Sequence, residues 1–411
     1  MSRVYVFFSY FIMSVMCFTF FVPVIDTVTI LNYTLRIFIY YFFAFTVPFY
    51  SLGCISLREK GRIGTRTLLV IFFSLFSCTM SLSVSSGFWI KVQDALLFLM
   101  PVALCSVAEH SRCSRTKCIY ILLIVNIIAG IVSFLAATGA LDLNLWAEEG
   151  MLARTAGVIN STLGIGGFAA ALILLFLDPE DKKAGRHRML ELFGLIGSIL
   201  VVLFSLSRTR IVLLIVICFA ILLYNLCVQK TIKGNVKMIA FIMVLLLLVI
   251  QLFPEIVSKL FDAIDGRYDL GNDINVRTRS AEQDMQLELF QENPIFGTGW
   301  GARGGVSVGR ASMYIHNIYT TLLMQTGIVG TLLYLGWQFS YFRTIMRALK
   351  KPKFKKDAVV GLAFLLSLFV LGFTNSGLTQ SGAFFMMFFI AALARDVEQE
   401  ERAEANKESG G

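Results

Sequence analysis

Charged residues are scarce in this sequence. Asp, Glu, Lys and Arg make up 15% of its 411 residues, whereas 57% are hydrophobic. That apolar content exceeds what the interior of a water-soluble protein of this length could bury, so the sequence predicts an integral membrane protein. The net charge of +9 lies in short clusters between apolar runs. This is the distribution of cytoplasmic loops, and it excludes a nucleic-acid-binding surface.

Patterns for metal binding, disulfides and repeats are also missing. The eight cysteines include no CxxC pair and mostly lie inside apolar runs, which indicates buried or reduced thiols. The long polar segment between residues 254 and 316 has no DxD or HxxxE spacing for a divalent ion at a phosphate. We therefore predict no metal and no cofactor. No repeat of fixed period is visible, which disfavours an inverted-repeat transporter.

The sequence is instead rich in apolar runs of about twenty residues, the length that crosses a bilayer core of about 30 Å. Twelve such runs predict an all-α polytopic membrane protein with about 12 transmembrane helices. The predicted spans are 4–25, 35–57, 67–88, 93–109, 118–138, 157–177, 189–206, 210–228, 236–253, 317–342, 357–374 and 381–394.

These runs divide the chain into four parts. Residues 1–253 hold nine spans, the first retained because no cleavage signal follows it, and 254–316 form one large outer loop. Residues 317–394 hold three C-terminal spans. The tail 395–411 is polar, charged and poor in aromatic residues, so we predict that it is disordered.

The basic residues predict the orientation. Twelve spans place both termini on one side, and 25 of the 36 Lys and Arg residues fall in the termini and loops of that side. Cytoplasmic loops carry this excess, so both termini are predicted to be cytoplasmic. The 254–316 loop then faces outward.

Two arginines break this pattern. Arg208 and Arg210 lie in SLSRTR, a very short outer turn between the seventh and eighth predicted spans. One interpretation is that they snorkel to the lipid head groups. The other is that they hold an anion at the outer membrane surface, since outer arginines run against the positive-inside bias.

The large outer loop contains a second set of polar residues. Arg277 and Arg279 precede a predicted helix that ends at Pro294, and a glycine-rich segment with the letters GTGWGARGG follows. Glycines let the backbone approach a ligand closely, although this segment lacks the lysine of a nucleotide-binding loop.

His316 is the one histidine in the predicted outer part, at the start of the tenth span. A single histidine at a membrane interface can be a structural hydrogen-bonding residue. Beside several arginines it can instead be a catalytic base, because a neutral imidazole takes a proton from a hydroxyl while guanidinium groups bind phosphates. The set predicts attack on a lipid diphosphate.

The order of these motifs resembles the O-antigen ligase and O-antigen polymerase superfamily, polytopic bacterial enzymes that transfer a glycan from a polyprenyl diphosphate carrier. The matching pieces lie between about Ser205 and Gly330: Ser207-Arg208, Arg279 leading into NPIFGTGWG, and HNIY followed by LLMQTGIVG. RTAGVINSTLGIGG is a looser match further upstream. The resemblance implies an inverting, metal-independent transferase on a GT-C-like helical frame.

The resemblance also implies roles for individual residues. His316 matches the catalytic base, and Arg208 and Arg279 match arginines that hold the diphosphate. The substrate-binding residues implied are Arg210, Arg277, Arg154 and Asn317. Gln283 stands where the family often has Trp, which leaves the register of the two loop arginines open.

The implied donor is a glycan on undecaprenyl diphosphate, and the implied acceptor is a saccharide or a lipid-linked glycan. The enzyme would lie in the bacterial inner membrane with a periplasmic active site, and a flippase or a chain-length regulator are possible protein partners. Polymerase is slightly favoured over ligase, because the outer loops lack a second basic surface for a phosphorylated lipid A core.

Two other classes of protein remain as alternatives. A transporter or flippase of lipid-linked sugars would need polar residues deep in several spans, and Asp94 is the main candidate for one. A purely structural membrane protein would leave the outer Arg and His residues unexplained.

Overall fold

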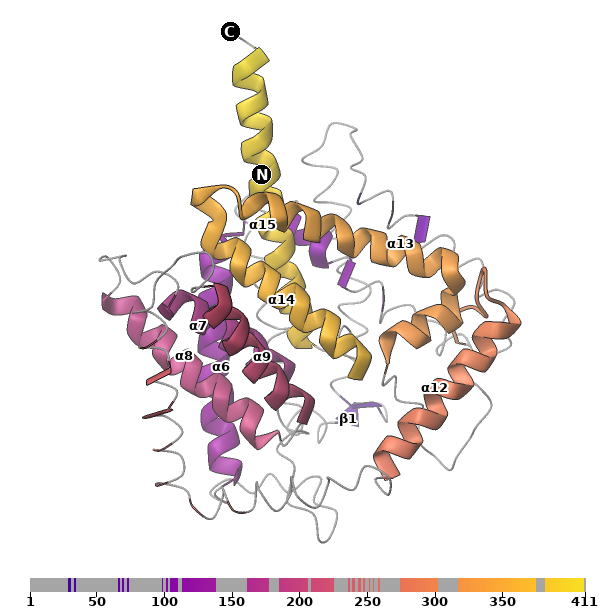
Figure 1. Cartoon of the computed structure of the whole chain (residues 1–411), viewed down its shortest axis with the longest axis horizontal. Helices are drawn as coiled ribbons and strands as arrows, with labels where there is room; N and C mark the ends of the chain where they lie inside the picture. Colours follow the sequence, from indigo (N-terminus) through magenta and orange to yellow (C-terminus); the bar gives the residue numbers. More distant parts are fainter. Residues whose placement is uncertain are drawn as a thin grey trace. The chain divides into compact units, whose positions relative to one another are not determined.

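The structure is a computed structural model of the chain. It describes residues 29–30, 33–34, 113–137, 161–176, 185–205, 208–224, 274–301, 317–374 and 381–409, with scattered positions between 66 and 109 and between 236 and 258. Almost all of these residues are helical (Figure 1). The exception is one short antiparallel pair, β1 (Thr29–Ile30) with β2 (Tyr33–Thr34). The predicted helical fold class is confirmed for this part of the chain.

The chain folds as two compact units. The first unit comprises residues 1–12, 40–113 and 271–411, and the second comprises residues 13–39 and 114–270. The candidate loop arginines and the histidine therefore belong to the first unit, and the SR element (Ser207-Arg208) belongs to the second.

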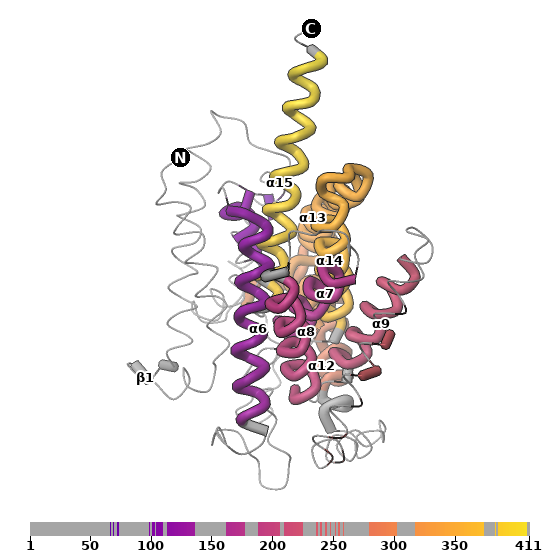
Figure 2. The backbone as a smooth tube through the Cα atoms, turned by 90° about the vertical axis from the view of Figure 1, so that its left-hand side faces the viewer, coloured from indigo at the N-terminus to yellow at the C-terminus, as the bar shows by residue number. Residues whose placement is uncertain are grey.

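Four helices form the described part of the second unit: α6 (Arg115–Ala137), α7 (Ser161–Phe176), α8 (Gly185–Phe204) and α9 (Arg208–Tyr224). Helices α6 and α8 lie side by side (Figure 2). Their backbones approach closely because Gly130 of α6 faces Gly197 of α8, where any added Cβ would overlap main-chain atoms. Such small-residue contacts are typical of helix packing in membranes. The buried Asn126 amide donates to the carbonyl of Leu163 at 3.3 Å and so ties α6 to α7.

The first unit is built from α12 (Ile274–Glu292), α13 (Ile318–Ala348), the short η4 (Pro352–Phe354), α14 (Lys355–Thr374) and α15 (Ser381–Ser409). Helix α13 packs on α12, α14 and α15. Aromatic side chains dominate the interior, with Tyr334 against Trp337 at 5.5 Å and Phe364 against Phe389 at 5.4 Å between ring centroids. Both pairs are buried.

Several described helices can cross a membrane. Three are long and apolar enough, Arg115–Leu135, Ile318–Ala348 and Pro352–Phe373, and Thr162–Phe176 and Thr209–Tyr224 are shorter apolar helices. These five match predicted spans to within a few residues, apart from the longer C-terminal end of α13. The total of twelve spans stays a prediction, because several of the predicted spans lie largely outside the described residues.

The C-terminal tail differs from the prediction. Instead of becoming disordered at residue 395, α15 continues as a helix to Ser409 and projects beyond the other helices of its unit (Figure 1). Its acidic side chains pair with basic residues in the last turn of α13 and just after it: Glu401 with Arg347 at 2.5 Å, and Glu404 with Lys351 at 2.7 Å. Composition alone suggested a solvated coil, but these ion pairs hold the segment as a helix.

Candidate active site

The start of α13 is the best-defined part of the candidate site. Asn317 is the N-cap, and its side-chain oxygen accepts hydrogen bonds from the backbone N–H groups of Tyr319 at 3.0 Å and Thr320 at 3.3 Å. Asn317 is 8% exposed. An N-cap asparagine satisfies helix donors that otherwise have no partner. The residue predicted to bind substrate therefore has a clear structural role here, and it determines where the chain leaves His316 and becomes helical.

Two neighbouring helices hold this first turn of α13. The buried Gln286 of α12 accepts a hydrogen bond of 2.5 Å from the Thr320 hydroxyl. On the other side, the Tyr319 hydroxyl donates to the carbonyl of Phe369 on α14 at 3.1 Å, and its ring packs 4.5 Å from that of Phe373. The position beside His316 is thus anchored to both α12 and α14.

The glycine-rich segment after α12 contacts protein rather than open space. Helix α13 breaks at Gly327, where φ is 60° and ψ is −167°. The segment 294–299 pairs with this break through four backbone hydrogen bonds. These run from Thr298 to Met324 (2.8 Å), from Gly299 to Gln325 (2.9 Å), from Ile328 to Pro294 (2.9 Å) and from Val329 to Ile295 (3.1 Å).

Two glycines make this pairing possible. A Cβ added at Gly297 would overlap the backbone nitrogen of Gly327, and one added at Gly327 would overlap the carbonyl oxygen of Ile295. Gly297 also has a positive φ of 74°. The expected close approach of glycine backbone is therefore present, but the partner of Gly297 is the backbone of α13 and not a ligand. Gly304 and Gly305 lie outside the described residues.

Trp300 anchors the end of the same segment. It is 2% exposed, and its ring lies 6.3 Å from that of Phe73, which in turn packs 5.3 Å from Tyr334 of α13. Burying an aromatic ring of this size contributes several kcal/mol. The segment from α12 to Trp300 is therefore a packed part of the first unit and supports the N-terminal half of α13.

The described geometry distinguishes the two loop arginines. Both lie on α12, and Arg279 is partly buried. Positions 279 and 286 are seven residues apart, so they share a helix face, whereas 277 is nine residues from 286 and falls on the opposite face. Because Gln286 contacts α13, position 279 is on the face turned toward α13. The helix period therefore favours Arg279 over Arg277 as the site arginine.

The SR element forms the start of α9 in the second unit. Arg208 is the first residue of the helix, and Arg210 is 8% exposed. A cation is unfavourable at a helix N-terminus unless an anion or another acceptor compensates for it. The burial of Arg210 favours an internal role over snorkelling to the membrane surface. The structure describes the backbone of Arg208 but not its side chain. Arg154 and His316 lie outside the described residues altogether.

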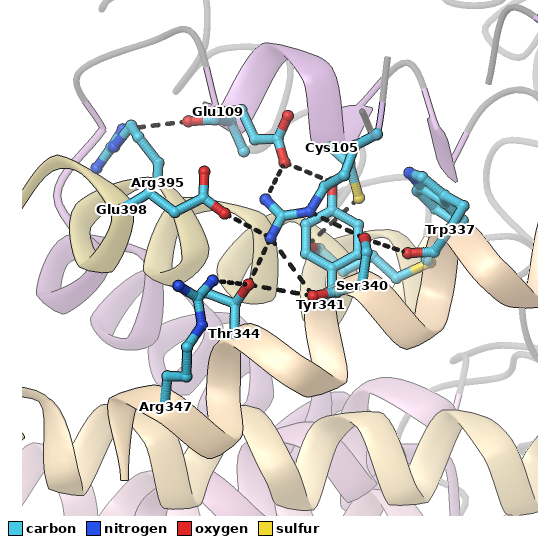
Figure 3. A network of polar contacts seen from close by, with 12 residues as sticks. Cys105, Glu109, Trp337, Ser340, Tyr341, Thr344, Arg347, Arg395 and Glu398 are labelled. Carbon is cyan, nitrogen blue, oxygen red and sulfur yellow. Dashed lines mark hydrogen bonds and ion pairs between the residues drawn. The ribbon is translucent and has the colours of Figure 1, made fainter. Parts of the chain in front are cut away.

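A cluster that the sequence analysis did not single out lies at the other end of α13. Its centre is Arg66, one of the 25 basic residues in the predicted cytoplasmic loops and termini. The Arg66 guanidinium donates to the carboxylates of Glu109 at 2.9 Å and Glu398 at 2.7 Å. It also donates to the hydroxyls of Ser340 at 2.9 Å and Thr344 at 2.6 Å. Figure 3 shows these partners around one guanidinium group: Ser340 and Thr344 from α13, Glu398 from α15, and Glu109.

The electrostatics of this Arg66 cluster are balanced. Burial alone lowers the pKa of the Arg66 guanidinium, but the nearby Glu109 and Glu398 outweigh it and raise that pKa above its ordinary value. Its carbon also lies 4.5 Å from the centre of the Tyr341 ring, a cation–π contact. The arginine therefore stays charged and holds three segments together. No local sequence pattern marks it, because its partners are 43 to 332 residues away.

Metal-binding chemistry has no support in the described ranges. Within them, no group of three or more His, Cys, Asp or Glu side chains could hold a metal ion.

Comparison with known proteins agrees with the motif order. Residues 193–335 match the family model described as O-antigen ligase. This stretch is about a third of the chain, and it contains the second half of α8, all of α9 and α12, the N-terminal half of α13 and every predicted site residue except Arg154. A search of curated proteins finds no match.

Proposed function

We propose that this protein, a glycosyltransferase-type enzyme that carries an O-antigen ligase domain at residues 193–335, moves a glycan from undecaprenyl diphosphate to a sugar hydroxyl on the outer face of the inner membrane. The observation that carries the proposal is the construction of the outer end of α13. There Asn317, the residue after His316, caps α13, and Thr320 of the first turn donates a hydrogen bond to Gln286 of α12, the helix that carries the arginines.

In this mechanism His316 is the general base. It accepts the proton of the acceptor hydroxyl as that oxygen forms a bond to the anomeric carbon of the donor. The bond between the anomeric carbon and the diphosphate oxygen breaks, and its electron pair leaves with undecaprenyl diphosphate. Displacement in one step inverts the anomeric centre.

Arginines bind the leaving group. Arg279 is on the face of α12 that packs on α13, and Arg208 and Arg210 begin α9. Guanidinium groups match phosphate oxygens in pairs and stay charged at every physiological pH. A preorganised donor aimed at developing charge contributes roughly 3 kcal/mol. Metal ions are then not needed to neutralise the diphosphate.

Between the two possible acceptors we favour a carrier-linked glycan, which makes the enzyme a surface-polysaccharide polymerase. The sequence of the predicted outer loops contains no second cluster of basic residues for a phosphorylated lipid A core. Ligation to lipid A core or another surface acceptor is the second candidate, because the matching family model is described by that reaction.

The test uses the full chain in lipid nanodiscs with a radiolabelled glycan on undecaprenyl diphosphate. We expect glycan transfer in excess EDTA when a carrier-linked acceptor is supplied. Transfer only to lipid A core would replace polymerase with ligase. Movement of the labelled lipid across the membrane without bond formation would support the transporter instead and refute the proposed reaction.

A further inference from the structure

The first unit contains a cavity of about 550 Å³ that has no part in the proposed reaction. Its walls come from α13, α14 and α15. Leu332, Gly336 and Phe339 line it from α13, Leu365 and Phe369 from α14, and Met387 from α15. The lining is almost entirely apolar. We refer to this cavity below as the lipid groove.

The lipid groove is bordered by the most exposed apolar side chains of α13. Leu332 is 64% exposed and Phe339 is 63% exposed, and Phe369 on the facing helix is 50% exposed. Both helices are long and apolar enough to span a membrane. Gly336 lies between these side chains, and a Cβ added there would meet nothing within 4 Å. The groove is therefore open sideways, where hydrocarbon surrounds the helices.

The length of the groove indicates what fits it. Its wall on α13 runs from Leu332 to Phe342, ten residue steps that rise about 15 Å at 1.5 Å each. That is half of a hydrocarbon core of about 30 Å, so it matches the acyl chain of a lipid in one leaflet. A polyprenyl chain of eleven isoprene units is far longer than this wall.

A cation lies at one end of the groove. Arg343 follows Phe339 by four residues, which places it on the same helix face about one turn further on. It is exposed, and within the described ranges no acidic side chain is paired with it. Arg347, one turn beyond, is instead bonded to Glu401. Arg343 is thus the cation that remains to meet a head group beside the groove.

We propose that the lipid groove binds an anionic phospholipid, with one acyl chain along α13 and the head-group phosphate on Arg343. The lipid belongs to the leaflet beside the 343–356 loop, which is predicted to be cytoplasmic. The site is distinct from that of the glycan donor, because Arg343 and the N-cap Asn317 are at opposite ends of α13. The bound lipid packs between α13 and α14 and stabilises the helix that carries the proposed site.

The experiment compares retained lipids by native mass spectrometry of the full chain, incubated with phosphatidylglycerol or with phosphatidylcholine of the same acyl chains. Gly336→Phe fills the groove, and Arg343→Ala removes the cation. Val370→Phe adds the same ring to an exposed position of α14 outside the groove, and Arg402→Ala removes an exposed cation of α15. These two variants are the matched controls.

We expect the wild type and both controls to retain phosphatidylglycerol, and each groove variant to retain about tenfold less, equivalent to about 1.4 kcal/mol. Arg343→Ala should also abolish the preference over phosphatidylcholine. Equal retention by groove variants and controls would overturn the proposal, and so would equal retention of the two lipids by the wild type. Displacement of phosphatidylglycerol by undecaprenyl phosphate with the same dependence on Gly336 would assign the groove to the donor lipid. If Gly336→Phe does not fold, the retention of phosphatidylglycerol by Arg343→Ala decides the test, because this side chain is exposed and its loss leaves the packing of the helices intact.

Discussion

Gly327→Ala tests whether the break in α13 holds the segment 294–299 against this helix. The φ of 60° and ψ of −167° at this position belong to a region that is essentially restricted to glycine. A methyl group there would also overlap the Ile295 carbonyl oxygen. The overlap is with backbone, so no change of side-chain rotamer can relieve it.

The expected cost follows from these two effects. The backbone conformation costs roughly 2 kcal/mol for a residue with a side chain. Each of the four hydrogen bonds between segment 294–299 and the break contributes ~1 kcal/mol. If the methyl group separates the two backbones enough to lose half of these bonds, the total loss is on the order of 4 kcal/mol. Such a loss lowers the unfolding midpoint by about 10 °C.

The assay is thermal unfolding in detergent, with glycan transfer measured on the same sample. Gly336→Ala is the matched control, because it lies in the same helix with helical backbone and open space around its Cβ. This control should gain up to about 1 kcal/mol, since alanine favours helix over glycine. If Gly327→Ala unfolds at the same temperature as Gly336→Ala and transfers glycan normally, the pairing of the glycine segment with α13 is wrong.

The other predictions concern the reaction and the Arg66 cluster. His316→Ala should keep folding and donor binding but lose about 100- to 10,000-fold in turnover, and a near-normal rate in a folded sample would exclude it as the base. Arg279→Lys should weaken donor binding far more than Arg277→Lys in a binding assay, and equal effects would contradict the helix-face argument. Arg66→Ala leaves the half-buried Glu109 without this cation and should cost about 2–3 kcal/mol in denaturant unfolding. Adding Glu109→Gln should recover part of that loss, and no recovery would mean that the ion pair is not the cause.

The helices themselves follow from local sequence. Apolar runs of about twenty residues predicted α6, α7, α9, α13 and α14 to within a few residues, because a chain in hydrocarbon must satisfy its backbone hydrogen bonds internally. The polar helix α12 was also predicted, since Pro294 ends it. The motif order predicted the family, and the match at 193–335 confirms it.

Local sequence did not reveal which groups these helices bring together. The glycines of the outer loop were expected at a ligand, and the partner of Gly297 is Gly327, thirty residues later. The α15 tail was expected to be disordered, and basic residues about fifty positions earlier hold it as a helix.

The physical reason is the range of the interactions. Apolar periodicity and capping act over a few residues, so the sequence by itself determined the helices, their membrane character and the α12 boundary. Pairing of charges and close approach of backbones depend on which helices pack together. Arg66 shows this most clearly, because its charge is compensated by Glu398, far away in the chain and adjacent only after folding. The tertiary structure alone decided that Arg66 holds the C-terminal part of α13, and that a glycine segment supports its N-terminal part.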